Sequence, residues 1–330
     1  MSRVALPWHD PQWRRVAAME EGGRLPHALL LRGPEGVGKG RFAWRLAARL
    51  LCEADADRPC GNCRGCRLFA AGSHPDLNIV EPEADRPTIS VDRVRRLIAA
   101  LALTNRYAPL KVVLIRCAET MTIQAVNTLL KTLEEPPGAS IFLLVAQRHA
   151  MLPATVLSRC QFLDFQLPEQ AAASAWLASE LGPGHDTETA LRQARGAPLR
   201  ALRVIQSDQG SAFQQLTATL LGLSEGQEDP LEAAEKWRKA GIETIISGLV
   251  SVAGDLVRIK MRVAPVALGE REGNTFQALA RRLDFNTLYR LLDRCLEARR
   301  EVIRRSGLNE MLLLEDLACA WNALRVRSAA

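Results

Sequence analysis

Residues 33–40 read Gly-Pro-Glu-Gly-Val-Gly-Lys-Gly, a P-loop motif with an altered last position. The motif requires glycine, four residues, glycine, lysine and then serine or threonine. Backbone N–H groups of such a loop hold phosphates, and the lysine, here Lys39, reaches the outer phosphates. The serine or threonine hydroxyl binds Mg²⁺, and Gly40 has none. We therefore expect a nucleotide-type pocket that lacks part of what hydrolysis requires.

The flanking residues fit the strand, loop and helix context of a P-loop. Residues 28–32 form an apolar run that leads into the loop, and apolar residues recur at helical spacing over residues 41–52. Further strands are predicted at residues 76–80, 111–115, 141–145 and 161–166. Helical patterns at residues 91–103 and 123–135 lie between them. The alternation predicts an α/β domain with a parallel sheet covered by helices on both faces.

The predicted strands end near residue 166, and the rest of the chain has a helical pattern. Three short helices are predicted at residues 169–180, 188–194 and 198–207. Residues 222–230 are polar and predict a loop. We therefore predict three domains: an α/β nucleotide-type domain at residues 1–166, a small helical domain at 167–207 and a helical C-terminal domain at 208–330.

Composition is typical of a folded protein with a sizeable core. The chain has 330 residues, of which 48% are apolar and 24% are charged. No run approaches the ~18 apolar residues of a membrane helix. The N-terminal residues lack the apolar core of a signal peptide, so we expect a cytoplasmic protein with no membrane partner. The net charge of +6 favours nucleic acid or nucleotide, although solvated helix faces explain it equally well.

Four of the eight cysteines form a cluster that predicts a metal site. They are Cys52, Cys60, Cys63 and Cys66. Two overlapping Cys-x-x-Cys steps with a fourth thiolate upstream match a tetrahedral Zn²⁺ site, and Gly61 and Gly65 allow tight turns between them. A reducing cytosol disfavours disulfides, and a redox Cys-x-x-Cys motif explains only two of the thiols. Four thiolates close the coordination shell, so we expect a structural role for zinc in residues 52–66.

The acids that P-loop ATPases place after the third strand are missing. Such a strand ends in a carboxylate for Mg²⁺, often followed by a glutamate that activates water. Here the strand at residues 111–115 is followed by Arg116 and Cys117. Glu119 lies two positions late and could compensate only with a shifted backbone. We therefore expect that this chain does not hydrolyse ATP.

Two sequence blocks are distinctive. Residues 127–137 read Asn-Thr-Leu-Leu-Lys-Thr-Leu-Glu-Glu-Pro-Pro, and residues 157–160 read Leu-Ser-Arg-Cys. Together they resemble the bacterial clamp-loader AAA+ subunits of DNA polymerase III. The cysteine insertion, Ser-His-Pro-Asp at residues 73–76 and the stretch at residues 308–317 extend the resemblance over the whole chain. The altered P-loop and the lost acids resemble a member of this family that does not hydrolyse ATP.

The resemblance implies an AAA+ domain, a small helical lid and a helical collar. It implies assembly with gamma/tau ATPase subunits and delta into a hetero-pentamer that loads the sliding clamp onto primed DNA. It also implies that Arg159 is an arginine finger for the ATP site of the neighbouring subunit. There a guanidinium stabilises the charge that develops in phosphoryl transfer. The alternative for Arg159 is a local ion pair at the start of a strand.

Several alternatives stay open at this point. The P-loop retains Gly33, Gly36, Gly38 and Lys39. It therefore either binds ATP or ADP without turnover or is a relic kept for packing. A second interpretation is an active ATPase motor of the same assembly, with Glu119 as its acid. A third is a DNA-binding zinc module in which Arg64 and Arg67 contact phosphate. Arg200, near the position of a second sensor, fits equally well as a solvated helix residue.

Overall fold

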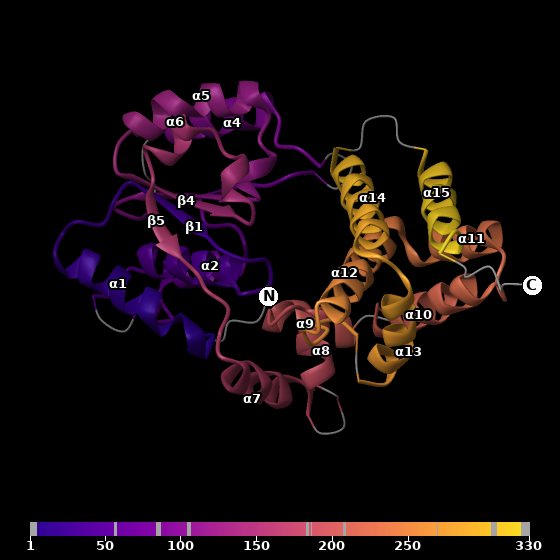
Figure 1. The fold of residues 1–330 in the computed structure, drawn as a ribbon. Helices are drawn as coiled ribbons and strands as arrows, with labels where there is room; N and C mark the ends of the chain where they lie inside the picture. The colour runs from indigo at the N-terminus through magenta and orange to yellow at the C-terminus, as the bar shows by residue number, and fades with distance from the viewer. Residues whose placement is uncertain are drawn as a thin grey trace, which may run out of the picture. The chain divides into compact units, whose positions relative to one another are not determined.

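The computed structural model describes residues 5–55, 58–83, 87–103, 107–182, 185, 187–206, 209–268, 270–304 and 309–324. The chain divides into two compact units, Met1–Ala172 and Ala173–Ala330. All strands of the described residues lie in the first unit, and the second unit is helical (Figure 1). Each unit has hydrophobic core residues of its own.

A five-stranded parallel sheet forms the centre of the first unit. Its strands are β1 (Ala28–Arg32), β2 (Leu77–Val80), β3 (Lys111–Arg116), β4 (Ser140–Ala146) and β5 (Gln161–Asp164). The order is β2-β3-β4-β1-β5, with every neighbouring pair parallel. In β1, which lies between β4 and β5, Leu30 is opposite Leu144 of β4 on one side and Phe162 of β5 on the other. The P-loop therefore follows a strand that is paired on both edges, and the predicted parallel α/β sheet is confirmed.

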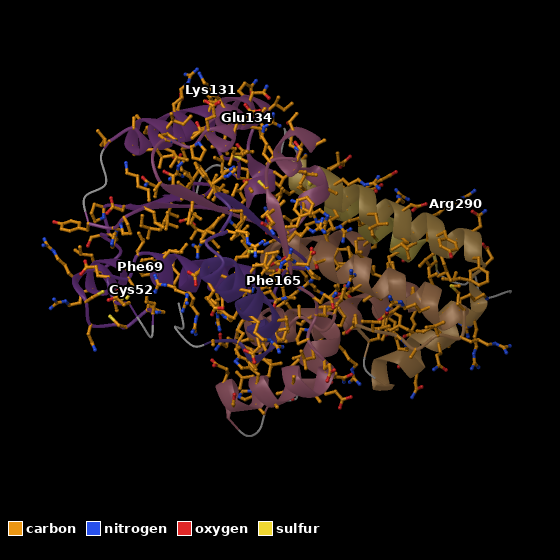
Figure 2. All side chains as sticks on the ribbon, turned by 90° about the vertical axis from the view of Figure 1, so that its left-hand side faces the viewer. Cys52, Phe69, Lys131, Glu134, Phe165 and Arg290 are labelled. Carbon is orange, nitrogen blue, oxygen red and sulfur yellow. The ribbon has the colours of Figure 1, made fainter. Side chains whose placement is uncertain are left out.

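Helices cover both faces of this sheet. One layer holds α1 (Asp10–Glu21), α2 (Lys39–Leu50) and α3 (Arg64–Ala70), and the other holds α4 (Val91–Leu101), α5 (Ile123–Glu134) and α6 (Ala154–Leu157). Leu29 packs in the core of the first layer and Leu30 in that of the second, because successive strand residues face opposite sides. Figure 2 shows Phe69 of α3 and Glu134 of α5 on opposite sides of the sheet.

Buried polar contacts fix the ends of these elements. Lys111, only 3% exposed, begins β3 and donates from Nζ to the carbonyl oxygens of Ala100 and Leu101, at 3.0 Å each. A positive charge at a helix C-terminus is favourable because it compensates the unpaired carbonyls there. Lys111 therefore joins the end of α4 to the start of β3. At the start of α5, Thr122 caps the helix by accepting from the backbone N–H of Ala125 at 3.2 Å.

The second unit is helical, and the helices after residue 208 pack around one core. Beginning just before the unit boundary, the helices are α7 (Gln170–Leu181), α8 (Thr187–Gln193), α9 (Pro198–Gln206), α10 (Gln209–Glu225), α11 (Pro230–Ala240), α12 (Ile242–Lys260), α13 (Glu270–Arg282), α14 (Phe285–Arg304) and α15 (Glu310–Asn322). Trp237 and Trp321 are fully buried in this core. Trp321 donates from its indole nitrogen to the carbonyl oxygen of Leu220 at 3.0 Å, which ties α15 to α10.

The structure corrects the predicted loop at residues 222–230, because α10 continues to Glu225. The division at residues 1–166, 167–207 and 208–330 stays a prediction, and residues 207 and 208 lie outside the described ones. Leu308, the first residue of the C-terminal stretch at residues 308–317, also lies outside the described residues. Among the described helices, none alone has the length and apolarity to cross a membrane. One pair, α11 with α12, meets that test by length and composition only when joined across a 118° bend.

Candidate functional site

The P-loop lies between β1 and α2 and needs glycine for two reasons. Gly33 and Gly38 have φ of 145° and 99°, a region that other residues rarely adopt. Both also lie against neighbouring atoms. A side-chain Cβ at Gly33 would fall 2.1 Å from the carbonyl oxygen of Phe165, and one at Gly38 would fall 2.3 Å from Leu6. The predicted glycines therefore form the expected turn, which packs tightly against Phe165, the residue after β5, and against the N-terminal segment.

A short N-terminal 3₁₀ helix, η1 (Pro7–His9), covers the loop. Trp8 donates from Nε1 to the carbonyl oxygen of Val37 at 2.9 Å, and Nε2 of His9 lies 2.9 Å from the same oxygen. The His9 ring also packs edge-on against Phe42 and Phe165. Burial lowers the pKa of His9 to about 4, so the imidazole is neutral at neutral pH. No motif or periodicity in the sequence marks His9, so this contact could not be predicted.

Lys39 makes its hydrogen bonds to the loop itself. Its Nζ donates to the carbonyl oxygens of Gly33 at 2.6 Å and Pro34 at 2.7 Å. The side chain is only 4% exposed. Burial lowers the pKa of Lys39 to about 8, although the charges of Glu119 and Glu35 oppose the shift. The lysine that reaches phosphate in P-loops is therefore satisfied by carbonyl oxygens of its own loop.

The groups after β3 are arranged as structural contacts. Arg116, in the position of the Mg²⁺-binding acid, pairs with Glu81 at 3.0 Å. Cys117 follows in the left-handed region, at a φ of 52°. Glu119 accepts from the backbone N–H groups of Gln147 at 3.1 Å and Arg148 at 3.3 Å. One oxygen of Glu119 is therefore bound to the segment that follows β4.

Arg159 lies between α6 and β5, and it makes the local ion pair that the sequence left as an alternative. Its Nε donates to Oε1 of Glu134 at 2.6 Å, and Nη1 donates to the carbonyl oxygen of Thr155 at 2.7 Å. The side chains of Arg159 and Glu134 are 30% and 47% exposed. Ion pairs this accessible to water contribute little stability, so the guanidinium can exchange Glu134 for another anion at small cost.

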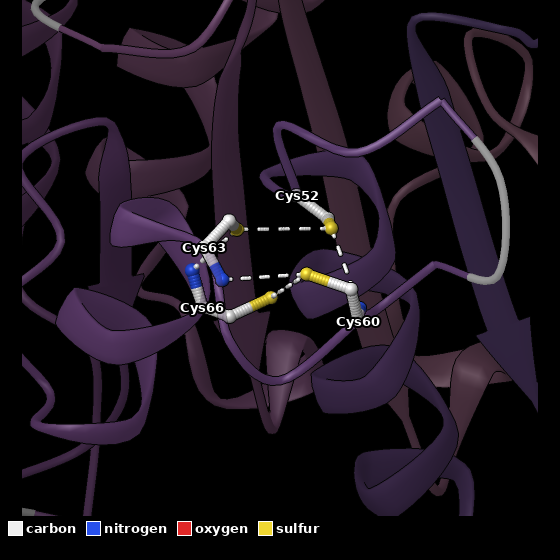
Figure 3. Close-up of side chains that lie close together, drawn as sticks. All are labelled: Cys52, Cys60, Cys63 and Cys66. Carbon is white, nitrogen blue, oxygen red and sulfur yellow. Dashed lines mark hydrogen bonds between the residues drawn. The ribbon is translucent and has the colours of Figure 1, made fainter.

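The four cysteines converge as predicted (Figure 3). Their sulfur atoms all lie within 4.8 Å of one another. Cys52 and Cys63 are 3.9 Å apart between Sγ atoms, and Cys60 and Cys66 are 4.0 Å apart. Four sulfurs at about 2.3 Å from one Zn²⁺ in a tetrahedron would be about 3.8 Å apart. The donor set and its spacing therefore fit a tetrahedral Zn²⁺ ion with no open position.

Backbone geometry holds the sulfur atoms in place. The N–H groups of Asn62 and Cys63 lower the pKa of the Cys60 thiol to about 6, which favours the thiolate that zinc requires. Burial raises the pKa of Cys66 to about 12, and a divalent cation would reverse that preference. Glycine is also required at position 65, because a Cβ there would lie 2.5 Å from the carbonyl oxygen of Leu51.

Two family models match the chain, and between them they span most of its length. The model described as "DNA polymerase III, delta subunit" matches residues 8–169, and "DNA polymerase III, delta subunit, C terminal" matches residues 207–323. The delta' subunit of DNA polymerase III from Pseudomonas aeruginosa is 33% identical over 324 residues, covering 96% of this chain and 97% of that protein. The chain belongs to the delta-prime family of DNA polymerase III subunits.

Other relatives agree with this assignment. The delta' subunit from Escherichia coli is 32% identical over 314 residues, covering 94% of this chain and 93% of that protein. Among solved structures, a DNA polymerase III gamma subunit-related protein from Thermotoga maritima is 15% identical, covers 93% of this chain and 98% of its own, and has a TM-score of 0.45. The family models and the relatives confirm the predicted clamp-loader family, and the structure confirms the parallel α/β domain with a cysteine insertion and a helical C-terminal region.

In this delta-prime chain the cysteine module is bound to the segment before β3. Asp76, 1% exposed, accepts from the backbone N–H groups of Tyr107 and Ala108, at 2.9 Å each. Arg64 stacks on the Tyr107 ring at 4.3 Å and donates to its hydroxyl group at 2.8 Å. Arg64 therefore has a structural partner. Arg200, in the helical unit, donates to the Ser247 hydroxyl of α12 at 3.1 Å.

Proposed function

We propose that this delta-prime chain is a non-hydrolysing subunit of the clamp loader that helps load the sliding clamp onto primed DNA. One observation carries the proposal. Lys39 is buried and bound to the carbonyl oxygens of Gly33 and Pro34, in a loop that lacks the metal-binding hydroxyl. Arg116 in place of the first acid supports it further, since a guanidinium paired with Glu81 repels Mg²⁺. The P-loop is then a structural turn.

Arg159 gives such a domain a role in the reaction of its neighbour. It would reach from the start of β5 into the ATP site of an adjacent gamma/tau subunit. An arginine finger supplied in trans contributes about 10³–10⁵ to the rate of phosphoryl transfer. The exposed, weak pair with Glu134 supports this role, because the guanidinium is accessible and exchanges its partner for the γ-phosphate at small cost.

The proposed assembly is a hetero-pentamer with the gamma/tau ATPase subunits and delta. Residues 1–166 would contribute the AAA+ domain, 167–207 the lid and 208–330 the collar that joins the ring. Zinc, held by Cys52, Cys60, Cys63 and Cys66, would stabilise the cysteine module without taking part in catalysis. Primed DNA and the clamp would be engaged through the complex.

Titration calorimetry of the purified chain with ATP and Mg²⁺ tests the nucleotide part of this proposal. We expect no measurable binding at neutral pH, because phosphate would have to displace both carbonyl partners of Lys39. Lys39→Ala serves as the control for background heat. ATP binding that disappears in Lys39→Ala would show that the P-loop binds nucleotide. ATP turnover that also requires Glu119 would establish that the chain is an active ATPase.

A further inference from the structure

A basic pocket lies in the helical unit, at the end of α12 and beside α13. It encloses about 720 Å³. Its lining includes the cationic side chains of Lys260, Arg262 and Arg281, together with Val263, Pro265 and Gln277. No carboxylate belongs to the lining formed by the described residues. Three positive charges around one hollow predict an anionic ligand.

Arg262 occupies a backbone position that favours glycine. Helix α12 ends in a Schellman-type turn, in which the N–H of Arg262 bonds to the carbonyl of Ile259 and the N–H of Val263 to that of Arg258. The φ of Arg262 is 63°, in the left-handed region. Glycine adopts this conformation at lower cost than arginine. The chain therefore has a long cationic side chain at a position where the backbone conformation favours glycine.

Helix dipoles account for part of this charge. Lys260 and Arg281 lie in the last turns of α12 and α13, where cations are favourable, and Nζ of Lys260 donates to the carbonyl oxygen of Arg281 at 3.0 Å. Arg262 lies beyond the end of its helix, so this explanation does not cover it. Asp284, the acid that follows α13, accepts hydrogen bonds from the N–H and hydroxyl groups of Thr287.

An exposed aromatic pair follows α13 in the chain. Phe285 and Tyr289 begin α14, are 43% and 45% exposed, and stack with ring centroids 6.3 Å apart and planes 27° apart. Proteins that bind single strands combine a basic groove for the backbone with aromatic faces on which bases stack. The basic pocket, which includes Arg281 of α13, and this pair, which follows α13 after a short turn of the chain, supply both kinds of group.

We propose that the basic pocket binds the phosphodiester backbone of single-stranded DNA, with the Phe285–Tyr289 pair stacking on bases beside it. The choice of DNA as the source of phosphate rests on the proposed clamp-loading function. Contacts of this type are independent of base sequence and weaken with salt, because binding releases counterions. The chain would thus hold a strand directly through its helical unit.

Fluorescence anisotropy with a labelled oligothymidine and the full-length chain, without nucleotide, tests this inference. We expect Arg262→Gly to weaken binding severalfold and to reduce the salt slope by about one, while the melting temperature stays equal or rises because glycine suits the turn. Arg281→Gln should act in the same direction. Lys239→Gln, which removes one positive charge from the exposed end of α11, is the matched control and should bind like wild type.

Binding that is unchanged in both pocket variants, or weakened equally by Lys239→Gln, would overturn the proposal. So would equal affinity for a duplex of the same length, since paired bases cannot stack on the aromatic pair. A purely structural role for Arg262 predicts a lower melting temperature with unchanged binding. The outcome is independent of Arg159, because the assay contains neither ATP nor partner subunits.

Discussion

Lys39 makes two short hydrogen bonds to its own loop, and His9 and Trp8 bind the same loop at Val37. At the scale of single residues, the polar groups of the P-loop are thus engaged in hydrogen bonds within the protein. Each polar group that would face a nucleotide has a protein partner: Lys39 the loop carbonyls, Arg116 the Glu81 carboxylate. On the proposed function, the groups that hydrolysis requires are missing at several positions, so restoring one of them should not produce hydrolysis.

Gly40→Ser tests that statement. A Cβ at Gly40 meets no heavy atom within 4 Å, so the variant should fold like wild type. The serine supplies the missing Mg²⁺-binding hydroxyl, but Arg116 still stands where the second metal ligand is needed. We expect phosphate release from ATP by the purified variant to stay at the level of Lys39→Ala. Turnover clearly above that level would show that only one group was missing.

The buried His9 predicts a pH dependence of stability. Burial lowers its pKa to about 4 from an ordinary value near 6.5, so the unfolded chain binds a proton that the folded one rejects between these values. Its contribution is therefore complete above about pH 6.5 and is lost as the pH falls toward 4. The full difference is of order 3 kcal/mol, at about 1.4 kcal/mol per pKa unit.

The measurement is urea unfolding of wild type and His9→Phe between pH 4 and 7.5. Other groups titrate in this range, and comparing the two proteins cancels their contribution. We expect wild type to lose more stability than His9→Phe as the pH falls. Parallel curves for the two proteins would show that His9 is protonated in the folded chain.

At the scale of elements, the cysteine module is a folded insertion whose parts support each other. Helix α3 begins at the cysteines, and Gly65 in its first turn brings the backbone close to Leu51. Asp76 and Arg64 then bind the segment at Tyr107 and Ala108. The metal site, the helix and the start of β3 are therefore expected to lose order together when the module is disturbed.

Gly65→Ala tests this coupling, with Gly40→Ala as its matched control in the first turn of α2. An added Cβ at Gly65 would lie 2.5 Å from the Leu51 carbonyl, whereas Gly40 has open space. We expect Gly65→Ala to lower the free energy of unfolding by about 1–3 kcal/mol, and Gly40→Ala to be neutral or slightly stabilising.

Metal analysis of the same proteins completes the test. Wild type and Gly40→Ala should hold about one zinc per chain, and Gly65→Ala should hold less. A ratio of zinc to wild-type chain far below one would contradict the proposed four-cysteine zinc site. One zinc per chain and an unchanged free energy of unfolding in Gly65→Ala would show that the close approach of Gly65 to Leu51 does not hold the module together.

The sequence predicts elements where periodicity is strong and misses contacts that need three dimensions. Leu30 and its apolar neighbours marked β1 because a strand buried on both faces is apolar throughout. Helix α3 was not predicted, since its glycine- and cysteine-rich residues show no apolar period. The convergence of Cys52, Cys60, Cys63 and Cys66 was predictable from their spacing alone. The pairs Lys39 with Gly33, Arg159 with Glu134 and His9 with Val37 could not be predicted, because side-chain partners depend on packing.

At the scale of the whole molecule, two findings support the proposed role as a clamp-loader subunit that does not hydrolyse ATP. They are the membership of the delta-prime family and the hydrogen bonds of Lys39 to its own P-loop. On the proposed function, the α/β domain retains its sheet and loop as structural elements, and the half-buried Arg159 would be the group that it supplies to the ATP site of a neighbouring subunit. The two compact units would divide the work between the arginine and the assembly of the ring. Arg159 must then act at the ATP site of a neighbouring subunit.

The most direct test is DNA-stimulated ATPase and clamp loading by a reconstituted loader carrying Arg159→Ala in this chain, with Glu134→Gln as the control. We predict that Arg159→Ala slows hydrolysis at the adjacent site by roughly 10³-fold or more and impairs loading. Glu134→Gln, which frees the guanidinium from its local partner, should retain activity. Wild-type ATPase and loading with Arg159→Ala would contradict the account.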